Sequence, residues 1–296
     1  MMKARIVPTL LLLVAGIWHS AWAQDSKSAT YTAPSMMKKS QQSSSDIEDI
    51  GEIEEQGANI PFRDKFRFNV GMQTSYTTNA LLSGNNDHSD VLFLPTVDAG
   101  FHTPLDKHFA FDLDASAQSA IYSRFQDHGF VGYDVLGTLD YHIKEGLPRF
   151  YVSVENYLYN TFDTGHLQSE AVGFTGGTDY GLAFNGGRSL GFVGYSLTEY
   201  VADPQIDTRL VNRAVVGFAH QLRGNLTAQI YYVYQYSDYN DFDRNDSKHT
   251  VSGALIYQFN DHWYGTLTTS YIDQSSTQQH ASYQSFATSL GLTLHF

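Results

Sequence analysis

The chain has 296 residues, a net charge of -13, 20 Tyr, 19 Phe, 24 Gly and no Cys. The negative charge argues against nucleic acid as a partner, and the lack of cysteine excludes a disulfide scaffold and a lipid-modified cysteine. Aromatic residues make up 14% of the chain, which is too many for a disordered protein. The mean hydropathy is slightly negative, so the chain is too polar for a helical membrane protein. A transmembrane β-barrel satisfies both facts, because apolar lipid-facing residues alternate there with polar lumen residues.

The first 23 residues predict a secretory signal peptide. Lys3 and Arg5 precede a short apolar run at 6–17, and an A-x-A-like site ends at Ala23. The run is too short for a comfortable span, and no later segment approaches the roughly 20 apolar residues of a transmembrane helix. We therefore expect export from the cytoplasm and cleavage after Ala23.

Residues 24–61 predict a disordered periplasmic tail. They contain Ser/Gln runs, Lys38-Lys39 and an acidic stretch at 46–55, with few large apolar residues. Such a segment cannot bury enough surface to offset the entropy lost on ordering. The alternative is that the tail folds back as a plug or contacts a periplasmic partner.

Residues 62–296 predict an all-β domain, because alternating stretches and turns follow one another throughout. Twelve strands are expected at 66–79, 89–102, 108–122, 130–143, 149–161, 169–184, 188–201, 207–221, 226–239, 248–259, 263–275 and 282–296. Five tight connections rich in Gly, Pro, Asn and Asp predict periplasmic turns, and six more polar connections predict outer loops.

An even strand number with both termini on the periplasmic side predicts a closed, antiparallel, up-and-down transmembrane barrel. A soluble β-sandwich is the alternative, but its strands average about five or six residues, which is half the length expected here.

The polar side of each strand should face the lumen, since charges near the membrane midplane cost about 2–4 kcal/mol on the lipid face. On this basis the lumen and its constriction are predicted to be lined by Asp112, Asp114, Asp134, Glu155, Arg209 and Arg213. The same rule turns Asp98, Asp140 and Asp179 inward, so that one wall is acidic and the two arginines lie across from it.

Two interpretations of this lumen stay open. The first is a water-filled channel whose transverse field orients polar solutes. The second is a salt-bridged interior that fills a narrow lumen and conducts nothing. Eight-stranded barrels are filled by side chains and those with 16 to 18 strands hold an aqueous pore, so a barrel of about twelve strands lies between these limits.

No catalytic residue, cofactor or metal ligand set is assigned from the sequence. The twelve histidines fall mainly at predicted strand ends. A hydrolase needs a serine and a histidine within hydrogen-bond reach and a third polar group that orients the histidine. The best pairs, His88 with Ser89 and Ser247 with His249, lack a recognisable motif. Acidic loop residues could bind divalent ions between lipopolysaccharide phosphates, but plainly solvated loops are the favoured interpretation.

The last eight residues alternate apolar with small or polar residues and include Gly291, Leu294 and the terminal Phe296. Together with the repeated hairpins and the segment 257–263 followed by Tyr271, they carry a resemblance over about 66–296. The chain resembles the β-barrel porin families of Gram-negative outer membranes.

The resemblance implies residence in the bacterial outer membrane, in contact with its lipids and lipopolysaccharide. It also implies that the barrel-assembly machinery recognises the C-terminal strand through Gly291, Leu294 and Phe296. The expected function is passive passage of small polar solutes or oligosaccharides. The alternatives are a closed barrel with a structural or export role, and an outer-membrane hydrolase, which the missing catalytic motif disfavours.

Overall fold

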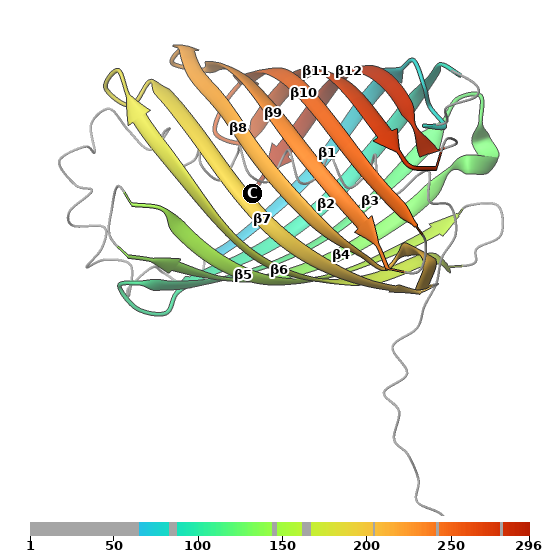
Figure 1. Cartoon of the computed structure of the whole chain (residues 1–296). Coiled ribbons are helices and arrows are strands. Elements are labelled where there is room, and N and C mark those ends of the chain that lie inside the picture. Colours follow the sequence, from blue (N-terminus) through green and yellow to red (C-terminus); the bar gives the residue numbers. More distant parts are fainter. Residues whose placement is uncertain are drawn as a thin grey trace, which may run out of the picture.

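The computed structural model describes residues 65–82, 88–143, 147–161, 167–203, 205–240, 243–278 and 281–296. Within them, twelve antiparallel strands form one closed barrel. The strands run obliquely around it, as Figure 1 shows. The predicted signal peptide (1–23) and tail (24–61) lie outside the described residues. No helix in the described ranges is long and apolar enough to cross a membrane.

Each strand pairs with its neighbours in sequence, and β1 pairs with β12 to close the barrel. The strands are β1 (Phe66–Thr77), β2 (Asp90–Pro104), β3 (Phe109–Tyr122), β4 (Phe130–His142), β5 (Arg149–Thr161), β6 (Leu167–Phe184), β7 (Ser189–Asp203), β8 (Arg209–Arg223), β9 (Leu226–Tyr239), β10 (Arg244–Gln258), β11 (Trp263–Ser276) and β12 (Tyr283–His295). Short 3-10 helices, η3 (Gln126–His128) and η4 (Gln205–Asp207), interrupt two of the loops. The predicted strand number and topology are confirmed.

The largest difference in strand limits is at β10, which begins at Arg244 instead of the predicted 248. Polar residues at 244–247 favoured a loop from sequence alone. In the structure these residues continue the backbone pairing with β9. Arg244 lies opposite Tyr239, and Asp246 lies opposite Ser237. Polar side chains are compatible with a strand here because alternate positions face the barrel interior.

The two ends of the barrel differ in their connections. The turn end carries the five tight turns, the start of β1 and the end of β12, whereas the loop end carries the six other connections. In the β6–β7 turn, Asn185, Gly186 and Gly187 have φ values of 56°, 66° and 80°. This left-handed backbone explains the Asn-Gly-Gly sequence.

Two turns at this end share one hydrogen-bonding pattern. In the β2–β3 turn, Asp106 Oδ1 accepts the backbone N–H groups of His108 and Phe109, both at 2.7 Å. In the β10–β11 turn, Asn260 Oδ1 accepts the N–H groups of His262 and Trp263 at 2.9 and 3.0 Å. A side-chain oxygen that satisfies two backbone donors fixes each turn, as Asp and Asn do elsewhere.

The outward face of the barrel is apolar and exposed. On β1 this face carries Phe66, Phe68, Val70, Met72 and Tyr76, with relative exposures of 39–55%. The strands run from 12 to 18 residues, whereas about 9–11 suffice to cross the hydrocarbon region. The strands therefore extend beyond an apolar belt.

The seam between β1 and β12 closes the sheet with both backbone and side-chain bonds. Phe296 N–H donates to the carbonyl of Phe68 at 2.9 Å, and the two rings lie 5.9 Å apart. Inside the barrel, Ser289 Oγ donates to Ser75 Oγ at 3.0 Å. These contacts hold the last strand against the first and leave no unpaired edge between them.

Candidate functional site: the lumen

An ion network lies inside the barrel near the turn end of β4, β5 and β6. Arg149 donates to Asp140 Oδ1 at 3.0 Å and, from Nε and Nη2, to Asp179 Oδ2 at 3.0 and 2.5 Å. Asp140 and Asp179 are buried, with relative exposures of 4% and 9%. One guanidinium therefore holds two buried carboxylates from neighbouring strands in charge-assisted bonds.

The network continues through β1, β2 and β3. Arg67 forms an ion pair with Asp114, and the His102 ring lies 2.8 Å from Asp112. Asn69 donates to Asp98 at 2.5 Å. The wall that the sequence predicted to be acidic is therefore partly neutralised by arginines of the same wall. Arg149 was missed because it follows Pro148 at the very start of the strand. It lies six residues before Glu155, so both side chains are on the inward face of β5.

A second group of charges, which we call the basic wall, faces the lumen from β8 and β10. It consists of Arg209, Arg213, Arg244 and Lys248. Arg244 pairs with Asp246, and Lys248 is 4% exposed. Arg209 and Arg213 were predicted. Arg244 was missed because the start of β10 was predicted to be a loop, whereas Lys248 was the first residue of the predicted strand and was not assigned to a face.

Aromatic rings hold the two arginines at the loop end. The Arg209 guanidinium lies 4.9 Å from the centre of the Tyr200 ring and 5.7 Å from that of Tyr239, and Arg244 lies 4.3 Å from the Tyr239 ring. Tyr200 also donates its hydroxyl to Glu155 Oε2 at 3.2 Å. Cation–π contacts of this kind favour charged groups in a partly desolvated place.

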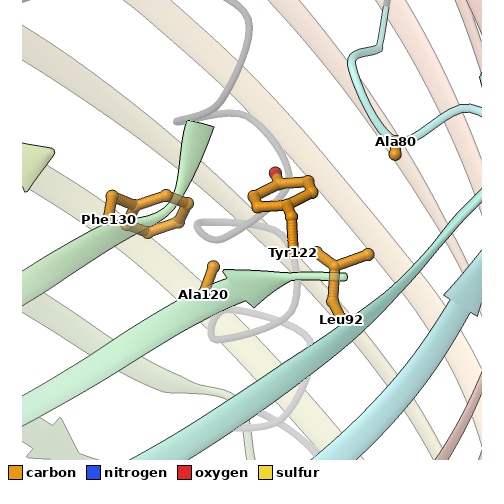
Figure 2. Close-up of a cluster of buried hydrophobic side chains, with 5 residues drawn as sticks. All are labelled: Ala80, Leu92, Ala120, Tyr122 and Phe130. Carbon is orange, nitrogen blue, oxygen red and sulfur yellow. The ribbon is translucent and has the colours of Figure 1, made fainter. Parts of the chain in front are cut away.

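Large inward side chains also lie at the loop end of several strands. Leu92, Tyr122 and Phe130, from β2, β3 and β4, form a buried cluster together with Ala80 and Ala120 (Figure 2). Further buried clusters are formed by Tyr157, Ala171, Tyr200 and Val211, and by Leu82, Ile272 and Tyr283. We call this ring of large inward side chains the loop-end collar. Sequence reasoning missed it because it ranked charged lumen residues above aromatic ones.

The structure places the six predicted lumen residues at different levels. Asp112 and Asp114 lie near the turn end of β3, whereas Arg209 is the first residue of β8, at the loop end. Register partners connect Asp114, Leu136, Glu155, Gly173, Tyr200 and Arg209 in one row across six strands. Because tilted strands make such a row climb around a barrel, these residues do not form a single ring.

Two further features of the described residues concern metal binding and the serine–histidine pairs. No group of three or more His, Cys, Asp or Glu in these ranges could hold a metal ion. Ser247 bonds to Tyr234 and His249 to Tyr232, so the serine and histidine of this predicted pair bind tyrosines. The hydrogen bond of 2.9 Å between Ser189 and His220 lies on the outward face near the turn end, away from the lumen.

The fold is a closed antiparallel β-barrel with a polar interior and an apolar outer face, the arrangement of membrane-spanning barrels. The segment 190–296, from β7 to the C-terminus, matches the family model described as Putative beta-barrel porin 2, which confirms the predicted resemblance. The comparison with curated proteins gave no match.

Among solved structures, an outer membrane channel from Pseudomonas putida F1 aligns with a TM-score of 0.56 and 11% identity, over 81% of this chain and 97% of that chain. The outer membrane channel DcaP of Acinetobacter baumannii aligns with a TM-score of 0.44 and 12% identity, over 78% and 96%. At 11% identity, the alignment with the Pseudomonas putida channel shows only that the two chains share the barrel fold.

Proposed function

We propose that this chain forms a channel in the bacterial outer membrane for passive passage of small polar solutes or oligosaccharides. The observation that carries the proposal is the contrast between the two faces of the barrel. The outward face is apolar, whereas at mid-height the inward face carries half-buried polar residues such as Gln118, Thr138, Ser153 and Thr268. A polar interior behind an apolar belt is the arrangement of transmembrane β-barrels, and in porins such an interior surrounds a water-filled channel.

Two further features support an outer-membrane channel. The segment that matches a porin family model includes the C-terminal strand with Gly291, Leu294 and Phe296, which would be the part that the assembly machinery recognises. The loop-end collar and the basic wall would form the narrowest part of the path. Aromatic rings and arginines at a constriction offer sugars and anions both stacking and hydrogen bonds.

The test is single-channel conductance of the refolded protein in planar bilayers. The protein without its first 23 residues would be compared with a variant that also lacks 24–61. Conductance steps from either protein support the channel. Silence from both, with folding confirmed by heat-modifiable gel mobility, would overturn it in favour of a closed barrel.

A further inference from the structure

Arg213 is a cation in the lumen wall that forms no ion pair with any described residue. It is the fifth residue of β8, and its side chain points inward, as do those of Arg209 and Val211. Its Nε–H is buried and has no hydrogen-bond acceptor. A buried donor without an acceptor costs free energy, and more so in a charged group. Arg213 therefore offers an anion both its charge and an unused hydrogen bond.

The charges at the loop end of the same wall balance one another. Asp207, in η4, is buried and interacts electrostatically with Arg209 and Arg244, and Asp246 pairs with Arg244. Two carboxylates thus accompany two guanidinium groups, and these four charges sum to zero. They leave the charge of Arg213 uncompensated.

The carboxylates of β4, β5 and β6 are held by other groups. Arg149 donates to both Asp140 and Asp179 at the turn end, and Glu155 accepts a hydroxyl group from β7. None of these three described carboxylates forms an ion pair with Arg213. A counter-ion for Arg213 would therefore come from a bound solute.

The side chains beside Arg213 on the neighbouring strands are neutral hydrogen-bonding groups. Ser196 on β7 and Gln235 on β9 are its cross-strand partners, and Lys248 on β10 follows Gln235 in the same row. Partners on one face of a sheet lie about 4.5–5.5 Å apart between Cβ atoms. A hydroxyl, a guanidinium and an amide can therefore contact one small ligand together.

A tyrosine extends this row of polar groups along the wall. Tyr151, on β5, lies across Gly177 of β6, where an added Cβ would clash with the tyrosine ring. Its hydroxyl is hydrogen-bonded to Ser196 on β7 and interacts electrostatically with Arg213. Because Gly177 has no side chain, the ring can reach across β6 and place its hydroxyl beside the other polar groups of the row.

This set of groups matches a carboxylate that is flanked by hydroxyl groups. A guanidinium is planar and binds both oxygens of a carboxylate through two parallel hydrogen bonds. The hydroxyl and amide groups on either side of Arg213 can donate to alcohols and accept from them. A solute that combines both functions is a sugar acid. A neutral sugar of the same size would leave the charge of Arg213 uncompensated.

We propose that Arg213, with Ser196 and Gln235, binds the carboxylate of a sugar acid in the lumen. This inference names a substrate class for the proposed channel, which would select sugar acids over neutral sugars. Only the passage of the solute rests on the proposed channel function. Binding at Arg213 can be measured without any passage.

Binding is tested by calorimetric titration of the refolded protein in detergent with sodium glucuronate. Glucose is the matched neutral probe, since it carries an alcohol where glucuronate carries the carboxylate, and a glucose phosphate is the second anion. We expect glucuronate to bind most tightly of the three. Tighter binding of glucose would overturn the proposal, and tighter binding of the phosphate would overturn the assignment to a carboxylate.

Arg213→Gln should weaken glucuronate binding by about tenfold or more, which is the share of one hydrogen bond to a charged group. Arg223→Gln is the control, because it removes the same charge from the exposed turn end of β8 and should leave the affinity unchanged. Equal affinities for the wild type and Arg213→Gln would overturn the proposal. So would equal losses in the two variants, since they would indicate attraction by net charge alone.

Protein stability separates ligand binding from a structural role of Arg213. Because its Nε–H is unsatisfied, Arg213→Gln should not lower the free energy of unfolding in the absence of ligand. Glucuronate should raise the unfolding midpoint of the wild type but not that of Arg213→Gln. A strongly destabilised variant would show that Arg213 supports the wall and would overturn the proposal.

Swelling of proteoliposomes separates the site from the channel. Faster entry of glucuronate than of glucose, with the preference lost in Arg213→Gln, supports both. Binding of glucuronate without entry of either solute supports the site and refutes the channel. Equal entry of both solutes in the wild type and in Arg213→Gln, without binding, supports the channel and overturns the site.

Discussion

Arg149 and Asp179 form a two-bond ion pair across β5 and β6, in which Nε and Nη2 donate to the same carboxylate oxygen at 3.0 and 2.5 Å. A third nitrogen, Nη1, reaches Asp140 on β4. One cation therefore links three neighbouring strands at the turn end. Its position makes this wall of the lumen a bonded network instead of a row of repelling carboxylates.

The first prediction concerns this shared cation. Arg149→Gln removes the charge between two buried carboxylates, and breaking a fully buried pair costs about 3–5 kcal/mol. Because the Arg149 side chain is 29% exposed, we expect a smaller loss, about 2 kcal/mol, in the free energy of unfolding measured by urea titration in detergent. Arg149→Lys keeps the charge without the planar fork and should lose less. Equal losses for Gln and Lys would contradict the role of charge.

The second prediction concerns the pH dependence of the β2–β3 turn. The N–H groups of His108 and Phe109 donate to Asp106 and hold its pKa below the usual value for Asp. A lowered folded pKa stabilises the protein above the unfolded value of about 3.9. That contribution is lost as the pH falls through the folded pKa.

Asn260 supports the same geometry in the β10–β11 turn without a titrating group. Asp106→Asn should therefore fold normally and unfold with a weaker dependence on pH below about 4, whereas Asp106→Ala should be destabilised at all pH values. Unfolding midpoints at several pH values check this. An unchanged acid dependence in Asp106→Asn would show that other carboxylates control it.

The third prediction concerns selectivity. Asp114→Leu removes the carboxylate that pairs with Arg67 in the lumen. In a conducting lumen, the loss of this negative charge should shift the reversal potential in a KCl gradient toward anion preference. Asp106→Asn lies in a turn outside the strands and serves as a charge-matched control. A folded Asp114→Leu protein with unchanged selectivity would argue against conduction past this wall.

The fourth prediction concerns assembly. Phe296 closes the seam by its backbone bond to Phe68, and its side chain is 62% exposed on the outward face. Deletion of Phe296 should lower the fraction of folded barrel in the outer membrane, as judged by heat-modifiable mobility of membrane fractions. Leu290→Ala is the control, since Leu290 lies on β12 and is similarly exposed, at 67%, on the same face. Normal insertion without Phe296 would refute the predicted assembly signal.

The strand number, the pairing order and the inward parity could be predicted from the sequence because each has a local cause. The alternation of Phe66, Phe68 and Val70 with Arg67 and Asn69 assigns the two faces of β1. Turn residues such as Asn185-Gly186-Gly187 mark the hairpins through their backbone preferences. These signals operate over two to twelve residues, which a single sequence contains.

The positions of the lumen residues along the barrel axis could not be predicted in this way. Asp114 and Arg209 share one row of register partners, yet they lie toward opposite ends of the barrel because the strands tilt. The partners of the acids, Arg67 for Asp114 and Arg149 for Asp179, come from other strands. Alternation thus determined which side chains face inward, while tilt and register, properties of the closed sheet, decided which of them meet.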